Sequence, residues 1–442
     1  MENREKMRVP RRILSSLLSS VSAGVVPRTG APYIAIGRKD EIGALLGDLE
    51  NIGEGGSSMR FLVGRYGSGK SFLMQLIRGY ALERDFLTAD ADLSPERRLY
   101  GTAGSGVATY RELMKNLASK ASPDGGALPR VIARWIGALR TESGVGDDLD
   151  ALRAAVNATL RDVEFMVGGF DFARVIAAYY EAYLDGNDML MSACLCWLRG
   201  EFTSKVEARR ALGFHVSVII DDENWYDFIK LFAVLARKIG YRGLVVFVDE
   251  CVNLYKISHR VSRENNYEKI LSMFNDALQG KAEGLLLVLG GTPQFLEDPR
   301  RGLFSYEALR SRLCDSRFSD AEFRNLIGPV IRLRRLSEDE LYALIVRVTA
   351  LYAEYYNWEP RITEAQQLRF LEICTARAGA DSMLTPREIL RDYMTVLNIL
   401  MQNADADFDR IVQKVAGESE IPAKSAETGG EKPNFDPEDI VF

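Results

Sequence analysis

Short apolar runs alternate with longer amphipathic stretches along this chain. There are five such runs: Arg60–Val63, Phe86–Asp90, Leu244–Val248, Leu285–Leu289 and Val330–Leu333. The run at Phe86–Asp90 follows the first long helical stretch, and each of the other four leads into a turn or a polar residue. An uninterrupted apolar run is typical of a parallel strand buried on both faces. The alternation of such strands with helices predicts an α/β fold with five parallel strands, arranged as a three-layer sandwich.

Two long segments show helical periodicity throughout. Residues 100–241 separate the second and third strands by far more than one crossover helix needs, which predicts a helical insertion. Within it, helices are expected at Phe172–Leu184 and Trp225–Ile239. After the last strand, Ser337 is a suitable N-cap, and residues 336–415 are predicted to form a helical lid. The lid helices are expected at Leu341–Tyr356, Glu364–Ala378 and Pro386–Gln402.

Residues 1–35 and 416–442 are expected to flank the nucleotide-binding core of residues 36–335. Near the amino terminus, an apolar stripe at helical spacing faces a row of serines, which predicts a short amphipathic helix. A signal peptide is disfavoured because Glu2 and Glu5 lie where such a peptide is basic. Residues 416–433 have the composition of a flexible linker. The final segment, 435–442, is either a docking peptide or a frayed end.

A phosphate-binding loop lies between the first strand and the helix expected at Ser71–Tyr80. Glycines in such a loop let backbone N–H groups converge on phosphate oxygens, and the helix N-terminus adds partial positive charge. Lys70 is expected to reach the β- and γ-phosphates, and Ser71 to hold Mg²⁺. The alternative is a glycine-rich turn that binds nothing. The loop predicts ATP or ADP as a ligand, with contacts from Gly64, Arg65, Tyr66, Gly67, Ser68, Gly69, Lys70, Ser71 and Phe72.

Two acidic residues follow the third apolar run. Asp249 is placed to hold Mg²⁺, and Glu250 to act as the general base that polarises the attacking water. The alternative is a strand with an acidic cap. Thr292 follows the fourth strand, where a polar residue in many P-loop ATPases helps to fix the lytic water. The chain is therefore predicted to be a Mg²⁺-dependent ATPase.

Composition limits the remaining classes of function. The chain has 442 residues, a net charge of −6 and 27% charged residues, typical of a globular protein without an overall basic surface. The Lys205–Arg210 stretch is basic, and a solvated helical face is preferred there over a nucleic-acid contact. No segment approaches the roughly 20 apolar residues of a membrane span. The sparse cysteines favour small buried side chains in a reducing cytosol, so the protein is predicted to be cytoplasmic.

The order of these motifs resembles that of AAA+ ATPases, especially the origin-recognition and STAND-like branch. In that branch a Gly-Arg pair before the P-loop lies where the chain wraps adenine, which implies a nucleotide contact by Ile36, Gly37 and Arg38. The resemblance also implies an arginine that reaches the nucleotide of a neighbouring subunit. Arg312 is the first candidate for that role and Arg310 the second. A homo-oligomer with shared sites is therefore implied.

The same resemblance extends to the lid and narrows to one family. Arg387 lies where the lid arginine of AAA+ proteins senses the γ-phosphate. The P-loop, residues 89–99 with their Ser-Pro-Glu-Arg-Arg element, and residues 243–255 resemble the BREX phage-defence ATP-binding family, BrxD-like and related to BrxC. The similarity covers about residues 13–400. It implies a bacterial defence role, with a helicase, a methyltransferase or duplex DNA as conceivable partners.

Three functions remain open at the level of sequence. The first is an oligomeric AAA+ ATPase that remodels or loads a defence complex on DNA. The second is a STAND-like switch that binds nucleotide with little turnover. The third is a scaffold that carries a structural nucleotide. Steady-state ATPase activity, with and without DNA, distinguishes the first from the other two.

Overall fold

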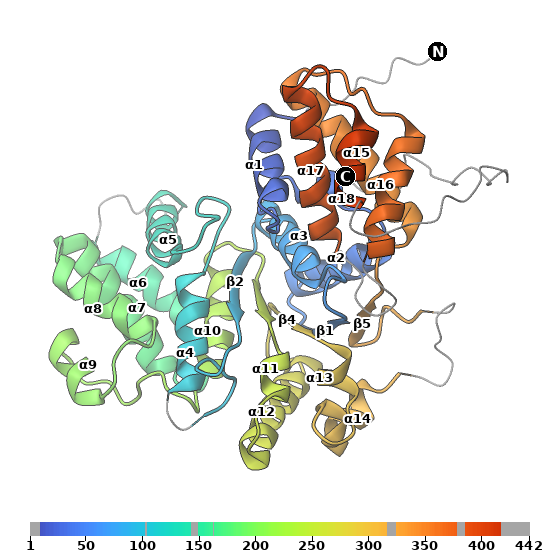
Figure 1. Ribbon diagram of the computed structural model, residues 1–442. Coiled ribbons are helices and arrows are strands. Elements are labelled where there is room, and N and C mark those ends of the chain that lie inside the picture. Colours follow the sequence, from blue (N-terminus) through green and yellow to red (C-terminus); the bar gives the residue numbers. More distant parts are fainter. Residues whose placement is uncertain are drawn as a thin grey trace. The chain divides into compact units, whose positions relative to one another are not determined.

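The computed structural model describes residues 9–101, 104–142, 149–161, 163–315, 324–377 and 385–416 (Figure 1). The chain divides into two compact units. The first, called here the P-loop unit, comprises residues 1–43, 64–79 and 333–442, and the second, the sheet unit, comprises residues 44–63 and 80–332. Each unit is described by itself.

A five-stranded, all-parallel sheet forms the centre of the fold, as the apolar runs predict. The strand order is β2-β3-β4-β1-β5. The strands are β1 (Ser58–Gly64), β2 (Leu87–Asp92), β3 (Leu244–Asp249), β4 (Leu285–Gly291) and β5 (Val330–Leu333). The register aligns Val63 of β1 with Gly291 of β4, so these strands end at the same edge. This edge carries the residues that follow the apolar runs.

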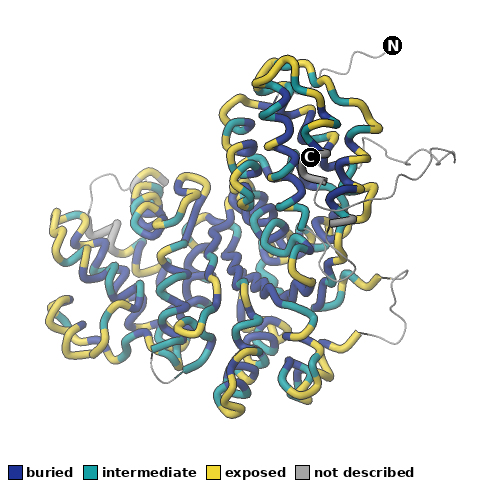
Figure 2. Tube along the Cα trace, in the orientation of Figure 1, coloured by how far each residue is buried: buried dark blue, intermediate teal, exposed yellow. Residues whose placement is uncertain are grey.

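Burial explains the apolar runs. Every residue of β4 is buried, as are the first five of β3, and the strands appear mainly in the dark blue of buried residues in Figure 2. Arg60 on β1 is charged but buried. Its guanidinium pairs with Asp48 at 2.6 Å and donates to the Ile327 carbonyl oxygen at 2.8 Å. A buried charge is tolerated only with such partners, so Arg60 joins β1 to the segment that leads into β5.

Helices make up the rest of the sheet unit. Between β2 and β3 the chain forms seven of them among the described residues: α4 (Ser105–Lys115), α5 (Leu128–Glu142), α6 (Leu149–Leu160), α7 (Gly169–Asp185), α8 (Asp188–Leu198), α9 (Lys205–Leu212) and α10 (Trp225–Lys238). After β3 come α11 (Val252–Tyr255), α12 (Arg260–Leu278), α13 (Pro293–Glu297), η2 (Leu303–Ser305) and α14 (Glu307–Leu313). The helical periodicity of the insertion thus corresponds to observed helices.

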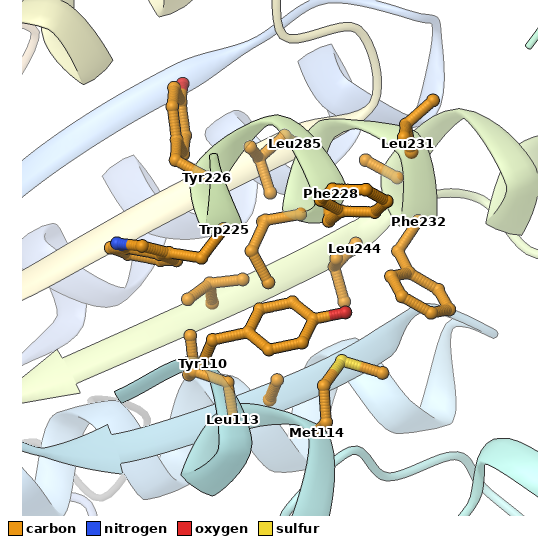
Figure 3. Close-up of a cluster of buried hydrophobic side chains, with 14 of the residues drawn as sticks. Tyr110, Leu113, Met114, Trp225, Tyr226, Phe228, Leu231, Phe232, Leu244 and Leu285 are labelled. Atoms are coloured by element: carbon orange, nitrogen blue, oxygen red, sulfur yellow. The ribbon is translucent and has the colours of Figure 1, made fainter. Parts of the chain in front are cut away.

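Aromatic side chains join the insertion to the sheet. Figure 3 shows Tyr110 and Met114 of α4 among Phe228 and Phe232 of α10 and Leu244 of β3. The Tyr110 hydroxyl donates to the Leu198 carbonyl oxygen at 2.6 Å, so its polar atom is satisfied within the core. Burial raises the pKa of Tyr110 well above its ordinary value. The insertion and the sheet therefore share one hydrophobic core.

The P-loop unit has a second hydrophobic core, made by helices. Its helical elements are α1 (Arg11–Ser22), η1 (Ala31–Ile34), the start of α2 (Lys39–Gly53), the start of α3 (Lys70–Glu83), α15 (Glu338–Tyr356), α16 (Glu364–Arg377), α17 (Pro386–Gln402) and α18 (Phe408–Ala416). The apolar stripe of α1 is buried, with Leu14 and Leu17 at most 2% exposed. Capping boxes begin α15 at Ser337 and α17 at Thr385. No helix among the described residues is long and apolar enough to cross a bilayer.

Candidate nucleotide site

The phosphate-binding loop connects β1 to α3 in the P-loop unit. Gly67 and Gly69 have φ values of +78° and +87°, a region that glycine enters without strain. Lys70 begins α3, and its Nζ donates to the Gly64 carbonyl oxygen at 3.0 Å. The Lys70 ammonium group is thus folded over the loop at a helix N-terminus, the arrangement that suits a phosphate. Binding of a nucleotide polyphosphate by this loop stays a prediction.

The segment before α2 lies against this loop. Arg38 is only 3% exposed, and its Nη2 donates to the carbonyl oxygens of Ser68 at 2.8 Å and Arg334 at 2.6 Å. Gly37 has φ +71°, and a Cβ there would lie 2.3 Å from Glu340 Oε1. Ile36 packs against the core of the same unit. The Gly-Arg pair and the P-loop are thus brought together. The implied contact of Ile36, Gly37 and Arg38 with a nucleotide stays a prediction.

A small pocket of about 40 Å³, partly open to solvent, lies beside the loop within the P-loop unit. Tyr66, which is 79% exposed, forms part of its wall. A Cβ on Gly67 would lie 2.6 Å from Thr385 Cγ2, so the loop packs directly on the N-cap of α17. The wall residues are Tyr66, Gly67, Arg335, Leu336, Leu341, Cys374, Thr375, Thr385, Pro386 and Ile389. The lining thus combines apolar and polar side chains from the loop, α16, α17 and the β5–α15 junction.

Arg387 does not contribute to the wall of this pocket. Its side chain is exposed on the first turn of α17, with its Cγ near the position of a Cβ on Gly24. Its assignment as the γ-phosphate sensor stays a prediction. The wall residues contributed by α16 and the β5–α15 junction were not expected from the sequence. Only a three-dimensional arrangement reveals them, because their spacing along the chain forms no motif.

In the sheet unit, Asp249 ends β3 and Glu250 begins a sharp turn. Glu250 has φ +58°, a left-handed conformation that is unusual for a residue with a Cβ. Its backbone N–H donates to Asp249 Oδ1 at 2.8 Å. The next residue, Cys251, is fully buried and donates its N–H to the Gly290 carbonyl oxygen. The turn therefore holds an exposed carboxylate on a constrained backbone, which is a frequent feature of functional sites.

Two residues near this turn went unrecognised in the sequence as parts of the site. Asp92 ends β2 and is in register with Asp249. Although its side chain reaches solvent, desolvation by surrounding protein atoms and the carboxylates of Asp249 and Glu250 raise the pKa of Asp92. Asn253 donates to the Leu93 carbonyl oxygen at 2.8 Å, which joins the turns after β2 and β3. The usable signal for Asp92 was its position at the end of a strand next to the Asp249 strand.

A family model decides the relationship of this chain to known proteins. It describes the BREX system ATP-binding protein BrxC/D and matches residues 9–416 of the 442. The chain belongs to this family. A comparison with curated protein sequences gave no match. The resemblance found in the sequence is thus confirmed, and this BrxC/D protein has an ATP-binding role in phage defence.

The remaining predicted site residues of this BrxC/D protein lie after β4. Thr292 is the N-cap of α13, and its Oγ1 accepts the Phe295 N–H at 3.3 Å. Arg310 and Arg312 are exposed on α14, and Arg312 Nη1 donates to the Ala308 carbonyl oxygen at 2.7 Å. These exposed positions are compatible with a contact to another chain. Their proposed roles stay predictions.

The sequence also led to predictions for the cysteines and for the C-terminal tail. Cys194, Cys251 and Cys374 are buried, whereas Cys314 is exposed, and within the described residues these cysteines form no disulfide. Burial raises the pKa of Cys194 to about 12, so this thiol is chemically quiet. The predicted linker and docking peptide within residues 417–442 lie outside the described residues.

Proposed function

We propose that this BrxC/D protein is a Mg²⁺-dependent AAA+ ATPase whose hydrolytic cycle serves phage defence. The observation that carries the proposal is the P-loop itself, with two glycines at positive φ and Lys70 Nζ 3.0 Å from the Gly64 carbonyl oxygen. The loop leaves β1, and the strand order makes β4 and then β3 the next strands of the sheet. Asp249 and Glu250 follow β3, as the chemistry of hydrolysis requires.

Each residue then has a chemical role. Lys70 and the loop N–H groups bind phosphate oxygens, and the hydroxyl of Ser71 and the carboxylate of Asp249 supply hard oxygen ligands for Mg²⁺. Bound Mg²⁺ neutralises charge on the phosphates. Glu250 accepts a proton from the attacking water, and Thr292 orients that water. Arg387 senses the γ-phosphate from the helical lid formed by α15–α18.

The proposal also includes assembly. A homo-oligomer would bring the exposed Arg312, or Arg310 two positions earlier on α14, to the nucleotide of a neighbouring subunit in the cytoplasm. Duplex DNA and other defence proteins, such as a helicase or a methyltransferase, are the partners on which such an assembly would act. In this scheme ATP binding favours assembly, and hydrolysis resets it.

ATPase assays on purified variants test the proposal. We expect Lys70→Ala to lose ATP binding and Glu250→Gln to bind ATP without turning it over. Arg312→Ala should keep ATP binding and lose turnover, whereas Arg260→Ala, which removes an exposed arginine paired with Glu264 on α12, should behave as wild type. Wild-type turnover by Arg312→Ala at saturating protein would refute the shared site. Tight ATP binding by wild type with negligible turnover, with or without duplex DNA, would instead identify a STAND-like switch or a scaffold.

Size measurement tests the assembly separately. We expect the wild-type chain to form larger species with ATP than with ADP or without nucleotide. The same measurement with duplex DNA shows whether DNA promotes assembly. An unchanged monomer under all these conditions would contradict the oligomeric part of the proposal and leave nucleotide binding intact.

A further inference from the structure

Arg38 is the most deeply buried arginine near the P-loop, and it donates hydrogen bonds to two backbone carbonyl oxygens. Its guanidinium donates to the carbonyl oxygens of Ser68, in the P-loop, and Arg334, at the β5–α15 junction. Its Nη1 lies 3.6 Å from the carboxylate of Glu41, which is 1% exposed. An arginine held by two backbone carbonyls and a buried carboxylate is fixed in position. The Arg38 side chain therefore holds the backbone of the P-loop at Ser68.

The Arg334 end of this contact continues into α15. Arg334 Nη1 donates to Glu340 Oε2 at 2.7 Å, and the Glu340 carboxylate also accepts the Ser337 N–H in the capping box. Burial of Glu340 acts to raise its pKa, but the hydrogen bonds from Arg334 and Ser337 outweigh it and lower the pKa below its usual range. Gly37 packs against the same carboxylate. A continuous set of contacts thus joins the P-loop backbone to the first turn of α15.

We infer that Arg38 is a positioning residue that sets the shape of the P-loop and transmits nucleotide binding to the N-terminus of α15. The inference rests on the proposed nucleotide site and goes beyond it, because it gives Arg38 a role that does not require contact with the nucleotide. A phosphate that draws the loop N–H groups toward it reorients the peptide carbonyls between them, including that of Ser68. Arg38 couples this carbonyl to that of Arg334, so both move together.

Nucleotide affinity is the first test. We expect Arg38→Met to weaken binding of ATP and ADP by about tenfold or more, because a charge-assisted hydrogen bond to the loop is lost. Arg38→Lys should recover part of the affinity, since an ammonium group still donates to a carbonyl. The matched control is Arg347→Met, which removes a donor to the Tyr33 carbonyl in the same unit, away from the loop. That control should bind within about twofold of wild type.

Hydrogen exchange is the second test, because a purely structural role would not change it in the expected way. In wild type, nucleotide should protect both residues 64–72 and the first turns of α15. In Arg38→Met at saturating nucleotide, protection of residues 64–72 should remain and that of α15 should disappear. Equal protection of α15 in wild type and Arg38→Met, or wild-type affinity in folded Arg38→Met, would overturn the inference.

Failure of the inference can be distinguished from failure of the proposed function. If Arg38→Met does not fold, Gly37→Ala and Arg38→Lys decide, since a Cβ at Gly37 meets the Glu340 carboxylate while the Arg38 side chain is retained. Wild-type affinity and α15 protection in both of these variants would overturn the inference. If wild type itself fails to bind ATP, the proposed function fails. Wild-type binding together with unaltered variants would defeat the inference alone.

Discussion

The loop after β1 and the turn after β3 follow two strands of one parallel sheet that are separated by β4, yet they reach positive φ in different ways. The P-loop uses Gly67 and Gly69, for which this conformation carries no Cβ penalty. The β3 turn uses Glu250, for which the same conformation costs about 1–2 kcal/mol. In the P-loop the proposed phosphate ligands are backbone N–H groups, so a residue without a side chain is sufficient there. Under the proposed function, the strain at Glu250 persists because its carboxylate is needed there.

Removing the Glu250 carboxylate should have the largest effect on ATP turnover. We expect both Glu250→Gln and Glu250→Gly to reduce ATP hydrolysis by about 10²–10⁴-fold, the usual contribution of a general base. Only Glu250→Gly should also raise the free energy of unfolding, by about 1 kcal/mol, because glycine relieves the strain at φ +58°. Steady-state ATPase assays and urea denaturation measure the two effects.

Asp85 provides the matched control for that comparison. It also has positive φ, +60°, but lies in the turn between α3 and β2. Asp85→Gly should gain similar stability and keep full hydrolysis. If Glu250→Gly were no more stable than Glu250→Gln, the backbone at Glu250 would not be strained, and the contrast between the two turns would fail.

In the P-loop, by contrast, adding a side chain at a glycine with positive φ should weaken ATP binding. Gly67→Ala places a Cβ at φ +78° and 2.6 Å from Thr385 Cγ2, so we expect ATP affinity to fall about tenfold or more. Gly79→Ala is the control, because a Cβ there, within α3, meets nothing within 4 Å. It should leave affinity unchanged and stabilise the helix by about 0.5–1 kcal/mol. Calorimetric titration with ATP would contradict the expectation if both variants bound alike.

The P-loop and the five strands were predictable because their signals are local. Uninterrupted apolar runs identify strands buried on both faces, and the spacing of Gly64, Gly69 and Lys70 identifies the loop. The same holds for α17, whose observed bounds match the prediction because Thr385 and Glu388 form a capping box within one turn. Such features depend on residues within a few positions of one another.

The rest of the site depends on residues that are distant in sequence. The contacts of Arg38 with Ser68 and Arg334 span 30 and 296 positions, and no short-range pattern specifies them. Glu250 has positive φ in the turn between Asp249 and the buried Cys251, and sequence patterns do not reveal this conformation. Thr375 and Cys374 reach the pocket only because α16 packs beside the loop in the P-loop unit. These features required the fold itself.

Asn253 tests how firmly the β3 turn is held. Its side chain donates to the Leu93 carbonyl oxygen, and Asn253→Ala leaves that carbonyl without this donor, which should lower the free energy of unfolding by about 1 kcal/mol. Asn116→Ala removes a similar bond to the Asp90 carbonyl oxygen from α4. Both variants should lose similar stability, but only Asn253→Ala should reduce ATP hydrolysis several-fold. Equal hydrolysis in the two variants would show that the turn keeps its shape without Asn253.

The smallest expected effect concerns the carboxylates themselves. Desolvation and the neighbouring Asp249 and Glu250 raise the pKa of Asp92, so the folded state favours its protonated form. The resulting destabilisation is absent below the unfolded-state pKa, grows as the pH rises, and is complete above the raised folded-state pKa. Asp92→Asn should therefore be more stable than wild type at pH 7 without Mg²⁺, by a few tenths of a kcal/mol or about 0.5 at most for a side chain that reaches solvent. Thermal unfolding at pH 7 and pH 3 measures the difference, which should vanish at pH 3. A difference that persists there would mean that ionisation of Asp92 is not its cause.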